Sequence, residues 1–245
     1  MAAAAAAEVD EPCCISHAFD RAARREPARL AVVHAGDGGR RLACGDLLSA
    51  VSSLSRRIAA ALPRPSTDHR GENGPPGSSD RHGGGAGATP RVVGVYAWPS
   101  AEYIIAVLAV LRCGEAFLPL EPSWPEDRVL SAVSASNAAL VVSAGVSHED
   151  DVLKGCSCPV LRLNGEIRQG LYDGEVGIGG DELAWPCERE RPREFCYVMF
   201  TSGSTGRPKG VCGTEKGISY IKGDYSSVAD GDNTTYPGEK YFMWI

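Results

Sequence analysis

An apolar strand that runs directly into a turn of hydroxyl residues and glycines constrains this chain more than any other feature. Residues 195–200 are all apolar or aromatic and predict a buried strand, and residues 201–210 then read Thr-Ser-Gly-Ser-Thr-Gly-Arg-Pro-Lys-Gly. Gly203 and Gly206 carry no Cβ, so the backbone there can turn its N–H groups inward. We therefore expect the chemistry of this chain at the carboxyl end of this strand.

A polyphosphate is held by hydroxyls, backbone N–H groups and a cation, and this turn contains all three. The P-loop pattern of ATPases does not fit, because Arg207 and Pro208 separate the last glycine from Lys209 and no Ser or Thr follows the lysine. The sequence thus favours a different kind of phosphate loop over a plain flexible turn. The predicted phosphate-binding residues are Thr201, Ser202, Gly203, Ser204, Thr205, Gly206 and Lys209.

Composition excludes several classes of protein. With 245 residues the chain can form one large α/β domain or two small ones, and its net charge of -6 disfavours nucleic acid as a partner. The longest apolar run, residues 104–111, is too short to cross a membrane. The nine cysteines show no paired spacing that would bind zinc, so we predict free thiols and no metal ligand. Residues 1–14 lack the marks of a targeting signal, and we expect them to be disordered and the protein to be cytoplasmic.

Helical and strand patterns alternate along the chain, which predicts a parallel sheet flanked by helices. A helix over residues 16–26 and a strand over 29–34 precede a helix that opens at residues 42–47 and has an apolar stripe to Leu62. Residues 63–90 are rich in Gly, Pro, Ser, Asp and Arg and predict a disordered insertion. The later predicted strands are 92–97, 116–120, 139–143 and 159–163, with a helix at 100–112.

A second helix is predicted after Ser123-Trp124-Pro125-Glu126, which has the form of a capping box in which Ser123 and Glu126 bond to each other's backbone N–H. We expect this helix to run through Asn137, with Leu130 and Val133 facing the core. Residues 164–194 show no clear period and predict a loop.

Residues 197–210 resemble the signature loop of the adenylate-forming (AMP-dependent synthetase/ligase) superfamily, which includes acyl-CoA synthetases, luciferases and the adenylation domains of nonribosomal peptide synthetases. Leu-Arg-Cys-Gly-Glu-Ala-Phe-Leu-Pro-Leu-Glu-Pro at 111–122, with Pro-Glu-Asp-Arg at 125–128, is similar to a second motif of that family, and residues 42–47 resemble a third. The resemblance implies a partial doubly wound parallel sheet, the N-terminal portion of the large domain of such an enzyme. The Pro-Leu-Glu-Pro segment resembles amino-acid-activating members, and residues 211–217 resemble the beta-alanine-activating enzyme type.

The resemblance implies that ATP and a carboxylic or amino acid give an acyl-adenylate and pyrophosphate, and that the acyl group passes to a thiol of CoA or of a phosphopantetheinyl carrier. In the family the loop holds the β- and γ-phosphates, while the magnesium ligand and the catalytic lysine lie downstream of this sequence. The resemblance therefore assigns no catalytic and no metal-binding residue to this chain. It extends over residues 15–217 and leaves 218–245 as a divergent tail, for which a frame change or an alternative exon junction is the expected cause.

Three other functions stay open at this point. The chain can be a non-catalytic truncated fragment or splice product of such an enzyme, which neither folds stably nor adenylates by itself. It can be an acyl-CoA synthetase of the fatty-acid type. A kinase-like phosphoryl transferase is disfavoured because the P-loop spacing is absent.

Overall fold

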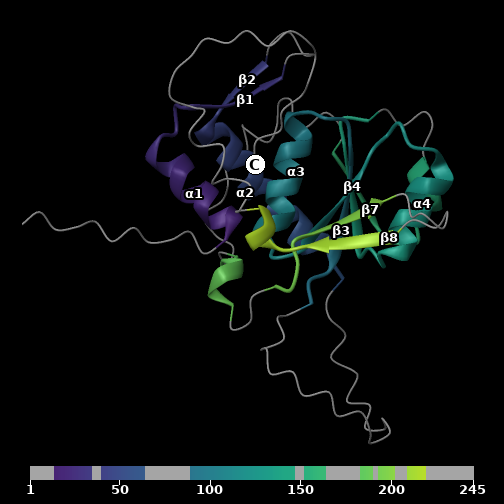
Figure 1. Cartoon of the computed structure of the whole chain (residues 1–245). Helices are drawn as coiled ribbons and strands as arrows, with labels where there is room; N and C mark the ends of the chain where they lie inside the picture. The colour runs from purple at the N-terminus through teal and green to yellow at the C-terminus, as the bar shows by residue number, and fades with distance from the viewer. Residues whose placement is uncertain are drawn as a thin grey trace, which may run out of the picture.

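The computed structural model describes residues 14–34, 40–63, 89–146, 152–163, 183–189, 193–201 and 209–218. Its centre is a six-stranded sheet with the strand order β6-β5-β3-β4-β7-β8 (Figure 1). The strands are β3 (Val92–Ala97), β4 (Ala116–Leu120), β5 (Leu140–Ala144), β6 (Val160–Leu163), β7 (Tyr197–Thr201) and β8 (Lys209–Gly213). All neighbours pair in parallel except β7 and β8, which are antiparallel. The predicted parallel sheet is confirmed, and the antiparallel edge strand β8 was not predicted.

Helices cover both faces of this sheet, as a parallel sheet requires. The helices α1 (Ile15–Arg25), α2 (Cys44–Ala61) and α3 (Ala101–Arg112) lie on one face, and α4 (Glu126–Ala135) lies on the other with the short helix η1 (Val152–Gly155) (Figure 1). The alternation of β3 shows this division: Val93 and Val95 pack into the core with α3, while Val92 and Tyr96 pack into the core with α4.

Helix α3 is the most deeply buried element described. Its apolar side chains run nearly all round the helix, and Ile105, Val107 and Leu111 are fully buried between the sheet and α2. The hydroxyl of Ser100 caps the helix by accepting a bond of 3.1 Å from the N–H of Tyr103. The predicted helix at 100–112, buried from both sides, is confirmed.

A separate antiparallel pair, β1 (Leu30–His34) and β2 (Arg40–Ala43), corrects the predicted start of the second helix. Leu42 and Ala43 belong to a strand, and α2 begins at Cys44. The N–H of Cys44 bonds to the carbonyl of Arg29 at 2.8 Å, so the backbone of this segment is paired with the end of β1 before the helix can start.

The predicted capping box at the start of α4 is wrong. The helix begins at Glu126 with Pro125 as its N-cap, and no side chain caps it. A helix that began at Ser123 would place Trp124 in helical geometry, which the following proline disfavours. The helix also ends at Ala135, because Asn137 adopts a left-handed φ of 50°. Within it Val129 and Val133 are fully buried, and Leu130 is half-buried.

Most of the predicted insertion and both terminal segments lie outside the described residues. The ends of the insertion are described, and the guanidinium Nη1 of Arg91 donates to the carbonyl of Pro63 at 2.7 Å. The eight cysteines in the described ranges are all free thiols. No described helix combines the length and apolar character needed to cross a membrane.

Candidate functional site

The β7–β8 hairpin brings the two described residues of the predicted phosphate loop together. Thr201 ends β7 and Lys209 begins β8, and the two are cross-strand partners. The hydroxyl of Thr201 donates to the carbonyl of Lys209 at 3.4 Å, and both side chains are exposed. The other predicted residues, Ser202, Gly203, Ser204, Thr205 and Gly206, lie outside the described residues. Whatever path the turn takes, its two ends meet at one point.

This point lies at the carboxyl edge of the parallel strands. Because β3, β4 and β7 run in the same direction, Trp98, Glu121 and Thr201 lie at one edge of the sheet, where these strands end. The N-termini of α3 and α4 follow β3 and β4 at that same edge, on opposite faces. Open sheets of this kind bind ligands outside the carboxyl ends of their strands, where the strand order changes direction, and helix N-termini there favour anions.

An arginine and two tryptophans line this edge. Arg128, in the first turn of α4, lies over the ring of Trp124 with its guanidinium carbon 4.0 Å from the ring centre. Trp98 is exposed just after β3. Stacking orients the guanidinium and leaves its N–H groups at the rim.

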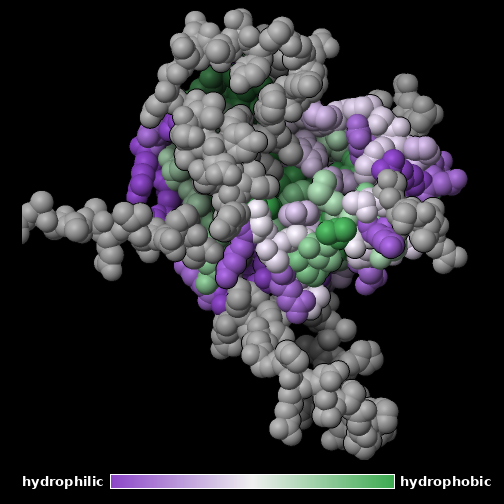
Figure 2. Space-filling model, in the orientation of Figure 1, coloured by the Kyte–Doolittle hydropathy of each residue, from purple (hydrophilic) through white to green (hydrophobic). Residues whose placement is uncertain are grey.

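One face of the hairpin is covered and the other is open. Val198 and Phe200 pack into the core formed with α4. Met199 and its cross-strand partner Val211 are 50% and 51% exposed, and Figure 2 shows a hydrophobic area where Figure 1 draws β7 and β8. The prediction of a fully buried strand over 195–200 is therefore wrong at Met199, because β7 pairs with an edge strand rather than lying between covered neighbours.

The base of the hairpin is held by an ion pair that sequence reasoning missed. Arg193, just ahead of β7, donates from Nη2 to Oε1 of Glu215, just after β8, at 2.5 Å. The same arginine donates from Nη1 to the carbonyls of Leu111 and Glu115. In the sequence, the sign of this pair is that opposite charges stand shortly before β7 and shortly after β8. This pattern could be recognised only once β8 was known.

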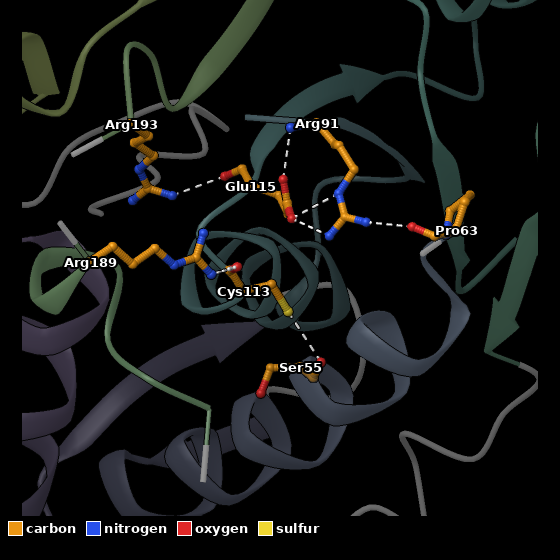
Figure 3. Close-up of polar contacts among 7 residues, drawn as sticks. All are labelled: Ser55, Pro63, Arg91, Cys113, Glu115, Arg189 and Arg193. Carbon is orange, nitrogen blue, oxygen red and sulfur yellow. Dashed lines mark hydrogen bonds and ion pairs between the residues drawn. The ribbon is translucent and has the colours of Figure 1, made fainter. Parts of the chain in front are cut away.

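Further arginines converge on the C-terminal end of α3 (Figure 3). Arg189 donates to the carbonyl of Cys113 at 2.6 Å, and the buried carboxylate of Glu115 accepts from the backbone N–H and the side chain of Arg91. Gly114 has a φ of 78°, and a Cβ there would collide with the guanidinium of Arg189. Cations and a left-handed glycine are the groups that stabilise the free carbonyls of a helix end.

The buried thiols of the described core are not nucleophiles at neutral pH. Burial, with a smaller effect of the Glu115 carboxylate, raises the pKa of Cys113 to about 12. Burial also raises the pKa of Cys196 to about 11. Cys113 instead donates a hydrogen bond of 3.1 Å to the carbonyl of Ser55 on α2. Through this bond Cys113 joins α3 to α2.

The donor set at the hairpin tip fits the phosphates of ATP. Lys209 provides an exposed ammonium group and Thr201 an exposed hydroxyl, at the mouth of a turn whose sequence contains three more hydroxyls and two glycines. Among the described residues, no carboxylate bonds to Lys209 or Thr201 and neutralises the cation. A polyanion can therefore approach this end of the hairpin.

Known proteins with similar sequences include peptide synthetases. The chain is 36% identical over 136 residues to the nonribosomal peptide synthetase agiA of Aspergillus flavus, which covers 56% of this chain and 2% of that protein. It is 30% identical over 198 residues to the AMB antimetabolite synthetase AmbB of Pseudomonas aeruginosa, covering 80% of this chain and 13% of the relative. It is 28% identical over 242 residues to surfactin synthase subunit 2 of Bacillus subtilis, covering 96% of this chain and 6% of the relative. The chain thus spans a small part of these relatives.

Solved structures show the same fold at lower identity. The N-terminal subdomain of Klebsiella oxytoca NpsA, in complex with 3-hydroxybenzoyl-AMSN, superposes with a TM-score of 0.56 at 19% identity and covers 85% of this chain and 42% of that one. The nonribosomal peptide synthetase FmoA3 in its AMPPNP-bound form gives a TM-score of 0.58 at 21% identity, covering 91% and 19%.

The family model described as AMP-binding enzyme matches residues 82–243. This range contains the whole Ser/Gly turn, and it continues past Gly217 into residues for which we expected no family resemblance. Since the match covers well over half of the sequence, the chain belongs to the AMP-binding enzyme family.

Proposed function

We propose that this chain binds the phosphates of ATP at the tip of the β7–β8 hairpin and serves the activation of an amino acid or another carboxylic acid as its adenylate. The observation that carries the proposal is the pairing of Thr201 with Lys209, which places a hydroxyl and an ammonium group side by side at the carboxyl edge of the sheet. ATP would supply the adenylyl group that the acid accepts, with release of pyrophosphate.

Each part of the turn has a separate role in this proposal. Lys209 holds phosphate oxygens by charge, and Thr201 with Ser202, Ser204 and Thr205 donates hydroxyl hydrogen bonds. Gly203 and Gly206 allow backbone N–H groups to approach the phosphates closely. The antiparallel pairing of β7 with β8 fixes the two ends of the turn, so less freedom is lost when the anion binds.

The acceptor and substrate classes follow from the family and from the relatives' names. Relatives named as nonribosomal peptide synthetases support an amino acid as the substrate and a carrier thiol as the acceptor. CoA is the other thiol that we include, magnesium is the ion expected with ATP, and the cytoplasm is the expected location. The solved FmoA3 structure with bound AMPPNP supports ATP as the nucleotide.

Binding of ATP to the full chain tests the phosphate site directly. We expect Lys209→Gln to raise the dissociation constant for ATP at least about tenfold, because a charge-assisted hydrogen bond contributes about 1.5–3 kcal/mol. Lys154→Gln is the matched control, because Lys154 is an exposed lysine in η1 on the α4 face. Isothermal titration calorimetry measures both. Equal affinity of Lys209→Gln and the parent would refute the site.

A second measurement tests the activity separately from binding. In a protein that joins this chain to the downstream part of a family member, which supplies the magnesium ligand and the catalytic lysine, ATP–pyrophosphate exchange should depend on an added amino or short carboxylic acid, and a panel of such acids identifies the class. Exchange with none of them, in a chain that binds ATP, would overturn the adenylation proposal and leave the phosphate site in place.

A further inference from the structure

The ion pair between Arg193 and Glu215 closes the base of the hairpin whose tip carries Thr201 and Lys209. Arg193 lies just ahead of β7 and Glu215 just after β8, so the pair joins the two chain segments that enter and leave the hairpin. Its side chains are only 5% and 21% exposed. Limited exposure reduces screening by water, so this contact is stronger than an ordinary surface ion pair.

Each partner of the pair is also bound to the end of a helix. The Nη1 of Arg193 donates to the carbonyls of Leu111 and Glu115, at 3.2 and 2.9 Å, where α3 ends. Oε1 of Glu215 accepts from the N–H of Ile15 at 3.2 Å, where α1 begins. The cation thus meets the negative end of one helix and the anion meets the positive end of another. The two charges cannot exchange places without facing the wrong helix ends.

Apart from Val198 and Phe200, which pack into the core formed with α4, the rest of the hairpin has few supports. Only Phe117 and Tyr197 are paired in the ladder between β4 and β7, and Met199 and Val211 expose their side chains on the uncovered face. The end that carries Thr201 and Lys209 therefore extends beyond its pairing with β4. The direction of that end depends on how firmly the base is held.

We propose that Arg193 and Glu215 are positioning residues for the phosphate site, which set the orientation of the hairpin and hence the place of Lys209. This inference rests on the proposed function. The pair touches no phosphate itself and acts through β7 and β8. Among the described residues Arg193 Nε is a buried donor without a hydrogen-bond partner. The carboxylate of Glu215 is therefore needed to offset the desolvation cost of this buried guanidinium.

The test uses Glu215→Gln in the full chain, which keeps the shape of the side chain and removes its charge. Hydrogen exchange is measured on the ligand-free protein at the amides of β7 and β8, and we expect it to accelerate about tenfold, because the hairpin opens more readily. The dissociation constant for ATP is expected to rise about fivefold to tenfold, a typical coupling between two sites. Arg193→Lys keeps the charge but loses the forked geometry, and it should give a smaller effect of the same kind.

The matched control is Arg91→Gln. Arg91 directly precedes β3 and forms another ion pair of 2.5 Å, with Glu115, which this variant breaks. It should lower the melting temperature without changing either the hairpin amides or the affinity for ATP. Unchanged hairpin exchange in both Glu215→Gln and Arg193→Lys would overturn the proposal, and so would an equal loss of ATP affinity in Arg91→Gln. A parent chain that does not bind ATP would refute the proposed function, whereas the exchange measurement would still decide whether the pair holds the hairpin.

Discussion

The ring of Tyr197 lies over Gly213, its cross-strand partner, in the space that a Cβ atom on residue 213 would occupy. The tyrosine ring thereby covers a strand residue that has no side chain of its own. Phe117 packs against this ring, with 5.8 Å between the ring centres. The ring of Tyr197 therefore contacts both Gly213 of β8 and Phe117 of β4, the strands on either side of β7.

Adding a single methyl group at this position should loosen the hairpin. Gly213→Ala forces the Tyr197 ring away from β8, and we expect the free energy of unfolding to fall by about 1–3 kcal/mol, the usual effect of overpacking. Urea denaturation followed by circular dichroism measures the change. In the double variant with Tyr197→Ala the two effects should be less than additive, because the ring that collides has been removed.

Gly217→Ala is the matched control for this experiment. A Cβ at Gly217 would meet only the Thr214 hydroxyl, at 3.8 Å, which is an ordinary contact. Its stability should stay within about 0.5 kcal/mol of the parent. Strictly additive effects of Gly213→Ala and Tyr197→Ala would show that the ring and the glycine do not interact.

Much of the central fold could be predicted because it depends on local pattern. The apolar residues of α3 run nearly all round the helix, which is possible only for a helix buried on two sides, and β3 is apolar throughout because helices cover both of its faces. Strand β2 has two arginines in four residues, and β8 has two glycines in five. Both are strands because a neighbouring strand offers backbone partners, and a local pattern contains no such information.

In the candidate site, too, the local sequence predicted some features, and others depend on the tertiary structure. The composition of the turn from Thr201 to Lys209 predicts a phosphate loop, since hydroxyls, glycines and a lysine together are chemically specific. The pairing of its two ends could not be predicted, because it requires β8. The contact of Arg193 with Glu215 could not be predicted either, since long-range ion pairs depend on the finished tertiary structure.

Alkaline solution should destabilise the protein through its buried thiols. The pKa of Cys113 is raised from 9.0 to about 12, so the unfolded chain releases this proton at a lower pH than the folded chain does. The stabilisation is fully present below about pH 9 and is lost as the pH rises toward 12, by up to about 1.4 kcal/mol per pH unit for this one thiol. Urea unfolding measured between pH 8 and pH 10.5 gives the slope.

Cys113→Ala separates this thiol from the other groups that titrate in the same range, such as Tyr103 with its pKa raised to about 12. The variant should be less stable at neutral pH, because it loses packing and the hydrogen bond to Ser55. Its stability should then fall less steeply than that of the parent as the pH rises. Parallel curves for the two proteins would contradict the assignment.

Replacing residues 64–88 by a Gly-Ser linker of about six residues should leave the fold intact and raise the free energy of unfolding by about 1 kcal/mol, because a shorter loop has a smaller closure entropy. The reason to expect tolerance is the bond from Arg91 to Pro63, which holds the two ends of this segment together. Thermal unfolding measures the difference. A shortened chain that no longer unfolds cooperatively would show that these residues contribute to the core.

The bond between the N–H of Ile15 and the carboxylate of Glu215 joins residues that are 200 positions apart in the chain. Helix α1 leaves the ribosome long before Glu215 has been synthesised, and the side chain of its N-cap, Cys14, does not cap the helix backbone. The start of the first helix described therefore gains its side-chain cap only when the last described segment has been synthesised. Until Glu215 emerges, α1 can pack on α2 and α3, but the N–H of Ile15 must find its partner in water.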